Sequence, residues 1–187
     1  MTTISRDFKV KIFADGAEKE KMLASAKDPM ISGFTTNPTL MKKGGVTNYK
    51  KFAQEIIEAI PDKSLSFEVF ADEFDEMEKQ AKEIASWGGN VYIKIPITNT
   101  KNESTFNLIK TLSDAGIKVN VTAMMTEEQV KSILPALKNS PGAYVSVFAG
   151  RIADTGIDPL PIMKNVVGML KEYPKVELIW ASPREVF

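Results

Sequence analysis

The stretch Val91-Tyr92-Ile93-Lys94-Ile95-Pro96 is an apolar run that contains a single lysine. Its composition predicts a short buried strand that ends at the proline. On either side, residues 73–87 and 103–115 carry apolar side chains at three- and four-residue spacing, so a helix is predicted before the strand and another after it. The stretch is therefore one strand in an alternation of strands and helices.

The same alternation runs along the whole chain. The predicted strands are residues 9–15, 33–37, 65–71, 91–95, 117–122, 143–148 and 176–181, and the predicted helices include 48–60, 73–87, 103–115, 127–138 and 160–173. A strand-then-helix repeat requires right-handed crossovers and a parallel sheet. Because no long reversal interrupts it, we expect one α/β domain over residues 1–187, a (β/α)8 barrel and not an open doubly wound sheet.

The barrel expected here is incomplete. A (β/α)8 barrel has eight strands, whereas the chain ends at Phe187, just after the seventh predicted strand. Seven parallel strands leave two unpaired edges. We therefore expect the eighth strand and the C-terminal helices to be missing. Three explanations stay open: the chain is a fragment, the barrel closes imperfectly, or another chain fills the gap.

Composition narrows the chemistry. The 24 basic and 24 acidic residues cancel, and no basic cluster with interleaved aromatics occurs, so neither a nucleic acid nor a membrane is expected as a partner. The chain has no Cys and no His, which excludes thiolate nucleophiles, histidine bases and most transition-metal sites. Residues 1–7 lack an apolar signal core, and no run approaches the roughly 20 apolar residues of a membrane span. We expect a soluble, cytoplasmic protein.

Lys94 is unusual because it lies inside an apolar strand. Burial disfavours its ammonium form, so a neutral and nucleophilic amine can become available near pH 7. Such an amine forms Schiff bases with carbonyl compounds. The alternative is a lysine that extends to the strand end or pairs with a carboxylate, and this segment alone leaves both interpretations open.

Polar side chains follow or interrupt almost every predicted strand. In a parallel barrel, the C-terminal strand ends and the loops after them build the active site, so these residues are its candidates. They are Asp15, Asn37, Glu68, Lys94, Asn120, Thr122, Ser146, Arg151, Ser182 and Arg184. Each alone has an ordinary explanation, such as a turn, a helix cap or a solvated charge. Glu68 is the hardest to explain so, because a buried carboxylate without a partner is costly.

These residues and their surroundings resemble the transaldolase family. The matching segments are Gly33-Phe34-Thr35-Thr36-Asn37-Pro38-Thr39-Leu40, Ile93-Lys94-Ile95-Pro96, Asn120-Val121-Thr122, Phe148-Ala149-Gly150-Arg151-Ile152 and Ala181-Ser182-Pro183-Arg184. They occur in the family's order over essentially the whole chain. The resemblance implies a (β/α)8 barrel that moves a dihydroxyacetone unit from a ketose phosphate to an aldose phosphate in the pentose phosphate pathway, without cofactor or metal.

The resemblance also implies a role for each matching residue. Lys94 would attack the ketose carbonyl and form a Schiff base, and Asp15 would take the proton of the C4 hydroxyl. Glu68 would shuttle protons through a water that Thr122 also holds. Substrate would be bound by Thr36, Asn37, Asn120, Ser146 and Phe148, and its phosphate by Arg151, Ser182 and Arg184.

Two alternatives remain beside transaldolase. Fructose-6-phosphate aldolases share the scaffold but carry Gln at the position of Glu68 and Tyr at that of Phe148, and both positions here resemble transaldolase. A chain without its last barrel unit could also be an inactive fragment or a scaffold that only binds sugar phosphates. The expected partners are sugar phosphates and, as in the family's rings, further copies of the chain.

Overall fold

A computed structural model describes residues 9–184, so residues 1–7, where a signal core was sought, lie outside it. The strands in this part of the chain are β1 (Ile12–Asp15), β2 (Ile31–Thr35), β3 (Ser64–Glu68), β4 (Val91–Pro96), β5 (Val119–Met124), β6 (Ala143–Val147) and β7 (Val176–Trp180). They form one sheet in the order β1 to β7, and every neighbouring pair is parallel. The seven predicted strands are confirmed.

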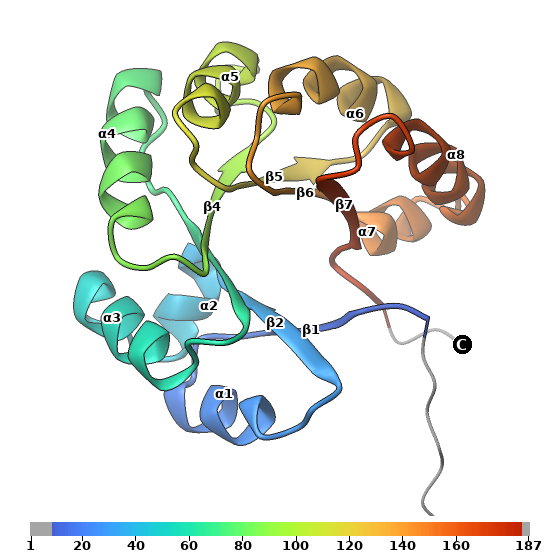
Figure 1. Cartoon of the computed structure of the whole chain (residues 1–187). Coiled ribbons are helices and arrows are strands. Elements are labelled where there is room, and N and C mark those ends of the chain that lie inside the picture. Colours follow the sequence, from blue (N-terminus) through green and yellow to red (C-terminus); the bar gives the residue numbers. More distant parts are fainter. Residues whose placement is uncertain (1–8, 185–187) are drawn as a thin grey trace, which may run out of the picture.

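The helices lie outside the curled sheet, as Figure 1 shows. They are α1 (Lys19–Ala26), α2 (Pro38–Lys43), α3 (Tyr49–Ala59), α4 (Phe74–Ala85), α5 (Phe106–Asp114), α6 (Glu127–Ile133), α7 (Ala149–Asp154) and α8 (Leu160–Leu170), with a 3-10 helix η1 (Leu134–Leu137). None of the helices between residues 9 and 184 has the length and apolar character needed to cross a membrane. The arrangement is an incomplete (β/α) barrel.

The core lies between the sheet and its helices. Alternate strand residues such as Phe67, Ile93 and Val121 are fully buried on that outer face. The other residues of each strand face the inside of the curve, which is aromatic near the strand starts. There Tyr144 packs against Phe13 and Tyr92, with ring centroids 5.4 Å and 4.4 Å away. This aromatic layer fills the N-terminal end of the barrel and leaves the C-terminal end for polar side chains.

Several element boundaries differ from the predicted ones for local reasons. The strand predicted at 33–37 ends at Thr35, because Asn37 caps α2 by accepting a hydrogen bond from the Leu40 amide at 2.9 Å. The strand predicted at 65–71 ends at Glu68, because the backbone amides of Phe70 and Ala71 donate to the side chain of Gln80. The helix predicted at 127–138 ends in the 3-10 turn η1, which contains a proline.

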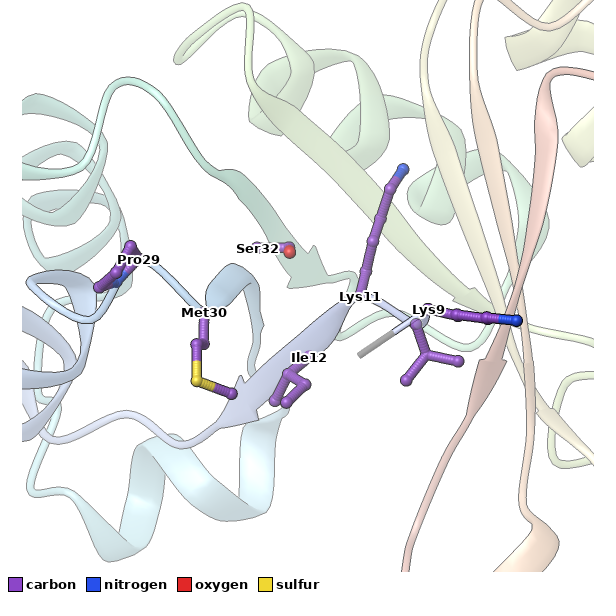
Figure 2. A pocket seen from close by; sticks show the side chains of 7 residues that line it. Lys9, Lys11, Ile12, Pro29, Met30 and Ser32 are labelled. Atoms are coloured by element: carbon purple, nitrogen blue, oxygen red, sulfur yellow. The ribbon is translucent and has the colours of Figure 1, made fainter. Parts of the chain in front are cut away.

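The sheet edges β1 and β7 lie on either side of a groove of about 670 Å³. An ion pair between Lys11 Nζ and Glu177 Oε2, 2.6 Å long, joins the two sides near the start of β7. No eighth strand occurs within residues 9–184. Figure 2 shows a second hollow, of about 320 Å³, beside the starts of β1 and β2 and lined by Met30 and Ser32. The hollow is at the N-terminal ends of these strands, whereas the predicted active site is at the C-terminal ends, so the two are separate.

Candidate active site

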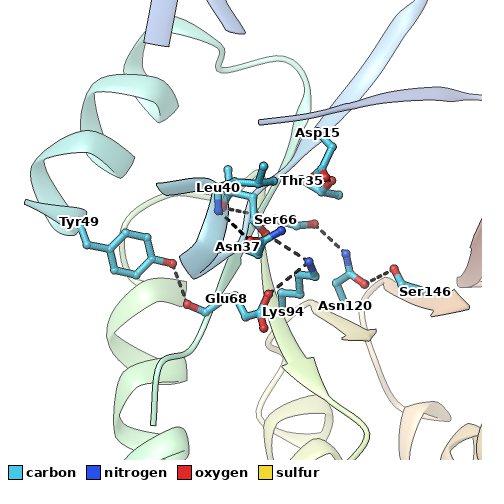
Figure 3. A network of polar contacts seen from close by, with 11 residues as sticks. Asp15, Thr35, Asn37, Leu40, Tyr49, Ser66, Glu68, Lys94, Asn120 and Ser146 are labelled. Carbon is cyan, nitrogen blue, oxygen red and sulfur yellow. Dashed lines mark hydrogen bonds and ion pairs between the residues drawn. The ribbon is translucent and has the colours of Figure 1, made fainter. Parts of the chain in front are cut away.

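Three polar side chains stand in one row across the middle of the sheet. Glu68 of β3 is in register with Lys94 of β4, and Lys94 is in register with Asn120 of β5. Residues in register on neighbouring parallel strands point to the same face. Figure 3 shows all three side chains converging inside the curve of the sheet. The predicted catalytic lysine and carboxylate are therefore neighbours.

Lys94 is 8% exposed, so its amine is nearly withdrawn from solvent. Its Nζ lies 3.2 Å from Glu68 Oε2 and donates a hydrogen bond of 3.2 Å to the Thr36 carbonyl. Pairing with a carboxylate was the alternative to a reactive amine, and the structure contains that pair. The two interpretations are compatible, because the partner carboxylate can itself receive a proton.

The Glu68 carboxyl group has a perturbed acidity. Burial raises the pKa of Glu68 above the ordinary glutamate value, the positive charge and hydrogen bond of Lys94 oppose this rise, and the negative charge of Asp15 adds to it. A carboxylate whose pKa is raised is a better proton acceptor at neutral pH. Glu68 is thus suited to acid–base exchange with the amine beside it.

A chain of hydrogen bonds continues the row into β6. Ser146 Oγ donates to Asn120 Oδ1 at 2.7 Å, and Asn120 Nδ2 donates to Ser66 Oγ at 3.0 Å. All three residues are buried. Ser66 was not among the predicted site residues, although its two-residue spacing from Glu68 places both on the same face of β3. The network holds the Asn120 side chain in one orientation.

Thr122 carries an unused polar group inside the barrel. It is 2% exposed, and its Oγ1 has no hydrogen-bond partner among the residues described. The strand changes course just after it, because Ala123 has a φ of 63° and the pairing with β6 shifts between Val121 and Met124. Such irregularities are common beside active sites. The free hydroxyl is suited to bind a water or a substrate hydroxyl.

The first two strands supply an exposed carboxylate and two engaged side chains. Asp15 accepts a hydrogen bond of 2.7 Å from Thr35 Oγ1 and is exposed at the end of β1. Thr36 Oγ1 donates to the Ser66 carbonyl at 3.1 Å, so this predicted substrate ligand uses its hydroxyl within the protein. Asn37 uses Oδ1 for the helix cap, and its side-chain amide hydrogens have no hydrogen-bond partner among residues 9–184.

A second polar group lies beyond β6 and β7. Arg184 pairs with Asp154 of α7 through two donors, Nε at 3.0 Å from Oδ1 and Nη2 at 2.6 Å from Oδ2. Its Nη1 donates to the Ser182 carbonyl at 2.9 Å and to Ser182 Oγ at 3.1 Å. A Cβ on Gly150 would collide with that same carbonyl oxygen, so only glycine permits this approach of α7. The predicted phosphate residues Ser182 and Arg184 are thereby brought together.

The remaining two candidates stack on each other. The guanidinium carbon of Arg151 lies 4.6 Å from the centre of the Phe148 ring. Phe148 directly precedes α7, and Arg151 lies on that helix one turn before Asp154. Within residues 9–184, no hydrogen bond or ion pair joins these arginines to the Lys94 row. The candidate site therefore has a lysine–carboxylate centre and a separate arginine corner.

Comparisons with known proteins give a consistent assignment. A sequence model described as Transaldolase/Fructose-6-phosphate aldolase matches residues 12–187. A probable transaldolase of Dehalococcoides mccartyi is 38% identical over 94% of this chain and 78% of its own length. A probable transaldolase 2 of Listeria monocytogenes is 35% identical over 95% of this chain and 77% of its own length.

Among solved structures, a monomeric dihydrodipicolinate synthase variant aligns with a TM-score of 0.59 over 90% of this chain and 62% of that protein, at 13% identity. At this identity the similarity concerns the fold alone. The sequence comparisons carry the assignment further, because the matched segment contains every strand and the whole row from Glu68 to Asn120. This chain belongs to the transaldolase/fructose-6-phosphate aldolase family.

Proposed function

We propose that this protein is a transaldolase that uses Lys94 as a Schiff-base nucleophile. Its donor is a ketose phosphate such as sedoheptulose 7-phosphate or fructose 6-phosphate, and its acceptor an aldose phosphate, as in the pentose phosphate pathway. The observation that carries the proposal is the nearly buried amine of Lys94, 3.2 Å from the Glu68 carboxylate. Family membership and the probable transaldolase names of the relatives support it.

The pair provides a route to a neutral amine. When Lys94 passes one proton to Glu68, the charged pair becomes a neutral amine beside a carboxylic acid. Burial favours this exchange, because it raises the pKa of the Glu68 carboxyl. The amine then attacks the C2 carbonyl of the ketose and forms a carbinolamine. Glu68 next gives its proton to the carbinolamine hydroxyl, which leaves as water, and an iminium remains on Lys94.

The water that relays these protons would lie between Thr122 and Glu68. Thr122 contributes a buried hydroxyl with no partner among the described residues, and it stands two residues after Asn120 on the same face of β5. A water bound by this hydroxyl and by Glu68 would carry protons between the carboxyl group and the reacting oxygen. Thr122 thus has a positioning role for that water.

Asp15 acts in the carbon–carbon cleavage. Its carboxylate takes the proton from the C4 hydroxyl, the C3–C4 bond breaks, and the bonding electrons move to the iminium, which becomes an enamine. The aldose phosphate leaves and an acceptor aldehyde takes its place. The enamine attacks this aldehyde, Asp15 returns the proton, and water releases Lys94. The hydrogen bond from Thr35 goes to Oδ1 of Asp15, and Oδ2, which has no hydrogen-bond partner among the described residues, is available for this exchange.

The other residues bind the substrate. Asn37 and Asn120 would hold the hydroxyls of the dihydroxyacetone part together with Ser146, and the fixed orientation of Asn120 supports its role. Arg184 and Ser182 would hold the phosphate, with Arg151 nearby on α7. Because Asp154 accepts from Nε and Nη2 of Arg184 and Ser182 accepts from Nη1, phosphate must use the second Nη2 hydrogen or displace one of these acceptors.

Fructose-6-phosphate aldolase is the second candidate, since the matching family description includes both activities. In that reaction the enamine is protonated and dihydroxyacetone is released. Glu68 and Phe148 favour transfer, because the apolar Phe148 ring cannot supply a proton to the enamine.

Borohydride reduction in the presence of fructose 6-phosphate, followed by peptide mass mapping, tests the proposal. The expected result is one dihydroxyacetone adduct, on Lys94, that is absent from Lys94→Ala. Lys118→Ala is the matched control: Lys118 is a partly buried lysine next to β5, but it contacts Gly89 at the opposite end of the sheet. Its adduct should equal that of the unmodified protein.

Two results would contradict the assignment. An adduct on a different lysine, or turnover that persists in Lys94→Ala, would exclude Lys94 as the nucleophile. A protein that binds fructose 6-phosphate but forms no adduct would be a non-catalytic sugar-phosphate scaffold. Release of dihydroxyacetone without transfer to an acceptor would establish the aldolase instead.

A further inference from the structure

Tyr49 contacts Glu68 but does not belong to the row of Glu68, Lys94 and Asn120. Tyr49 opens α3, and its hydroxyl donates a hydrogen bond of 2.9 Å to the backbone carbonyl of Glu68. In Figure 3, Glu68 lies between Tyr49 and Lys94. Tyr49 thus contacts the backbone of Glu68 from a helix outside the barrel, while the side chain of Glu68 contacts Lys94 inside it.

The Tyr49 ring is locked in place by three aromatic neighbours. Its centroid lies 4.8 Å from that of Phe70, 5.4 Å from Trp87 and 6.1 Å from Phe67, all in edge-to-face arrangements. Burial raises the pKa of the Tyr49 phenol, and the nearby charge of Glu68 adds to the effect. The hydroxyl therefore stays protonated and remains a donor throughout the neutral range.

Further contacts hold the backbone on the C-terminal side of Glu68. The Val69 amide donates to the Lys94 carbonyl at 3.1 Å. Gln80 of α4 accepts from the Phe70 amide at 2.7 Å and from the Ala71 amide at 2.9 Å. Helices on both sides of β3 thus clamp the end of this strand, and Tyr49 supplies the contact at Glu68 itself.

We infer that Tyr49 is a positioning residue for the Schiff-base centre, which holds the backbone of Glu68 so that its carboxylate stays against Lys94. The inference rests on the proposed function for its catalytic consequence. A side chain can keep a 3.2 Å contact only if its backbone is held, and Glu68 is the last residue of its strand. Without the phenol, the carboxylate would spend less time within reach of the amine.

Tyr49→Phe keeps the ring and removes only the donor. The rate of borohydride-trapped adduct formation on Lys94 should fall about three- to tenfold, the ratio that corresponds to one typical hydrogen bond. KM for fructose 6-phosphate should stay unchanged, because the arginine corner is untouched. Tyr144→Phe is the matched control: it also loses a tyrosine hydrogen bond, to Ser64 at 3.3 Å, but at the far end of the sheet. In Tyr144→Phe, the adduct on Lys94 should form at the same rate as in the unmodified protein.

A second measurement separates this inference from the proposed function. Titration of ¹³C-labelled glutamate carboxyls in the substrate-free protein, with Glu68 assigned by Glu68→Gln, reports the pair directly. In Tyr49→Phe the Glu68 titration should move to higher pH, since the buried carboxylate loses part of the attraction of Lys94. In Tyr144→Phe it should not move.

The proposed function and the role of Tyr49 are contradicted by different results. Absence of any adduct in the unmodified protein would overturn the proposed function, and the carboxyl titration would still decide the role of Tyr49. An unchanged Glu68 titration in Tyr49→Phe would overturn the inference, as would equal losses of trapping in Tyr49→Phe and Tyr144→Phe, which would show a general effect on stability.

Discussion

Glu68 and Lys94 stand opposite each other on neighbouring parallel strands, with the amine 3.2 Å from the carboxylate. They are 26 positions apart in the chain, and the pairing of β3 with β4 brings them together. Both side chains are largely buried, so neither charge is shielded by solvent. This pair determines the expected pH dependence of catalysis and the effect of substituting Glu68.

The first prediction concerns the acid limb of kcat/KM. When the pH falls, Glu68 becomes protonated, and the pair loses the group that accepts the lysine proton. Because burial raises the pKa of Glu68, this loss should begin at a higher pH than for an ordinary glutamate, whose pKa is about 4.3. A pH–rate profile in the free-enzyme limit measures it, and its apparent value belongs to the pair.

Glu68→Gln checks that assignment. The amide keeps the shape but cannot exchange protons, so the rate should fall about 10²- to 10⁴-fold and the acid limb should vanish. Glu73→Gln is the control, because Glu73 is an exposed carboxylate at the start of α4 that pairs with Lys101. An acid limb that survives in Glu68→Gln would assign it to another group.

The second prediction concerns phosphate recognition. Arg184→Ala should raise KM for phosphorylated sugars about tenfold to a hundredfold, and leave KM for unphosphorylated sugars nearly unchanged, because a charge-assisted contact is lost. Arg151→Ala should act in the same direction more weakly. Steady-state kinetics on both classes of sugar measure the effect. Equal losses on both classes would mean that the arginine is structural.

The third prediction uses two helix glycines. Gly150→Ala places a methyl group against the Ser182 carbonyl, so the loop that carries Arg184 must shift. KM for phosphorylated sugars should rise, and the free energy of unfolding should fall by about 1–3 kcal/mol. Gly168→Ala, in exposed surroundings on α8, meets no atom and should stabilise the protein by about 0.5–1 kcal/mol. Chemical denaturation compares the two, and similar behaviour of both variants would show that the contact of α7 is unimportant.

The fourth prediction concerns the balance between transfer and release. Phe148→Tyr adds a hydroxyl that can protonate the enamine, so dihydroxyacetone release should rise while transfer to erythrose 4-phosphate falls or stays level. The measurement is the ratio of the two rates. Glu68→Gln alone should slow both reactions, whereas the double variant with Phe148→Tyr should be faster than Glu68→Gln, because the tyrosine supplies a proton donor. An unchanged ratio in Phe148→Tyr would identify Phe148 as a packing residue.

Much of the fold follows from local properties of the chain. Strand and helix periodicities, which are set by backbone geometry, predicted all seven strands. The same period of two placed Asn120 and Thr122 on one face, as the structure has them. The isolated position of Lys94 in an apolar strand predicted its burial. These inferences needed only the neighbours of each residue along the chain.

The contacts between side chains of different helices, strands and loops depended on the tertiary structure. Strand register and the curl of the sheet decide that Ser66 meets Asn120 and that Asp154 holds Arg184, at sequence separations of 54 and 30 residues. Tyr49 likewise reaches Glu68 only because α3 packs beside β3. No local pattern encodes such distances, since they result from how every strand is placed on the next. The sequence by itself therefore determined which residues face the interior, and the packed sheet decided which of them touch.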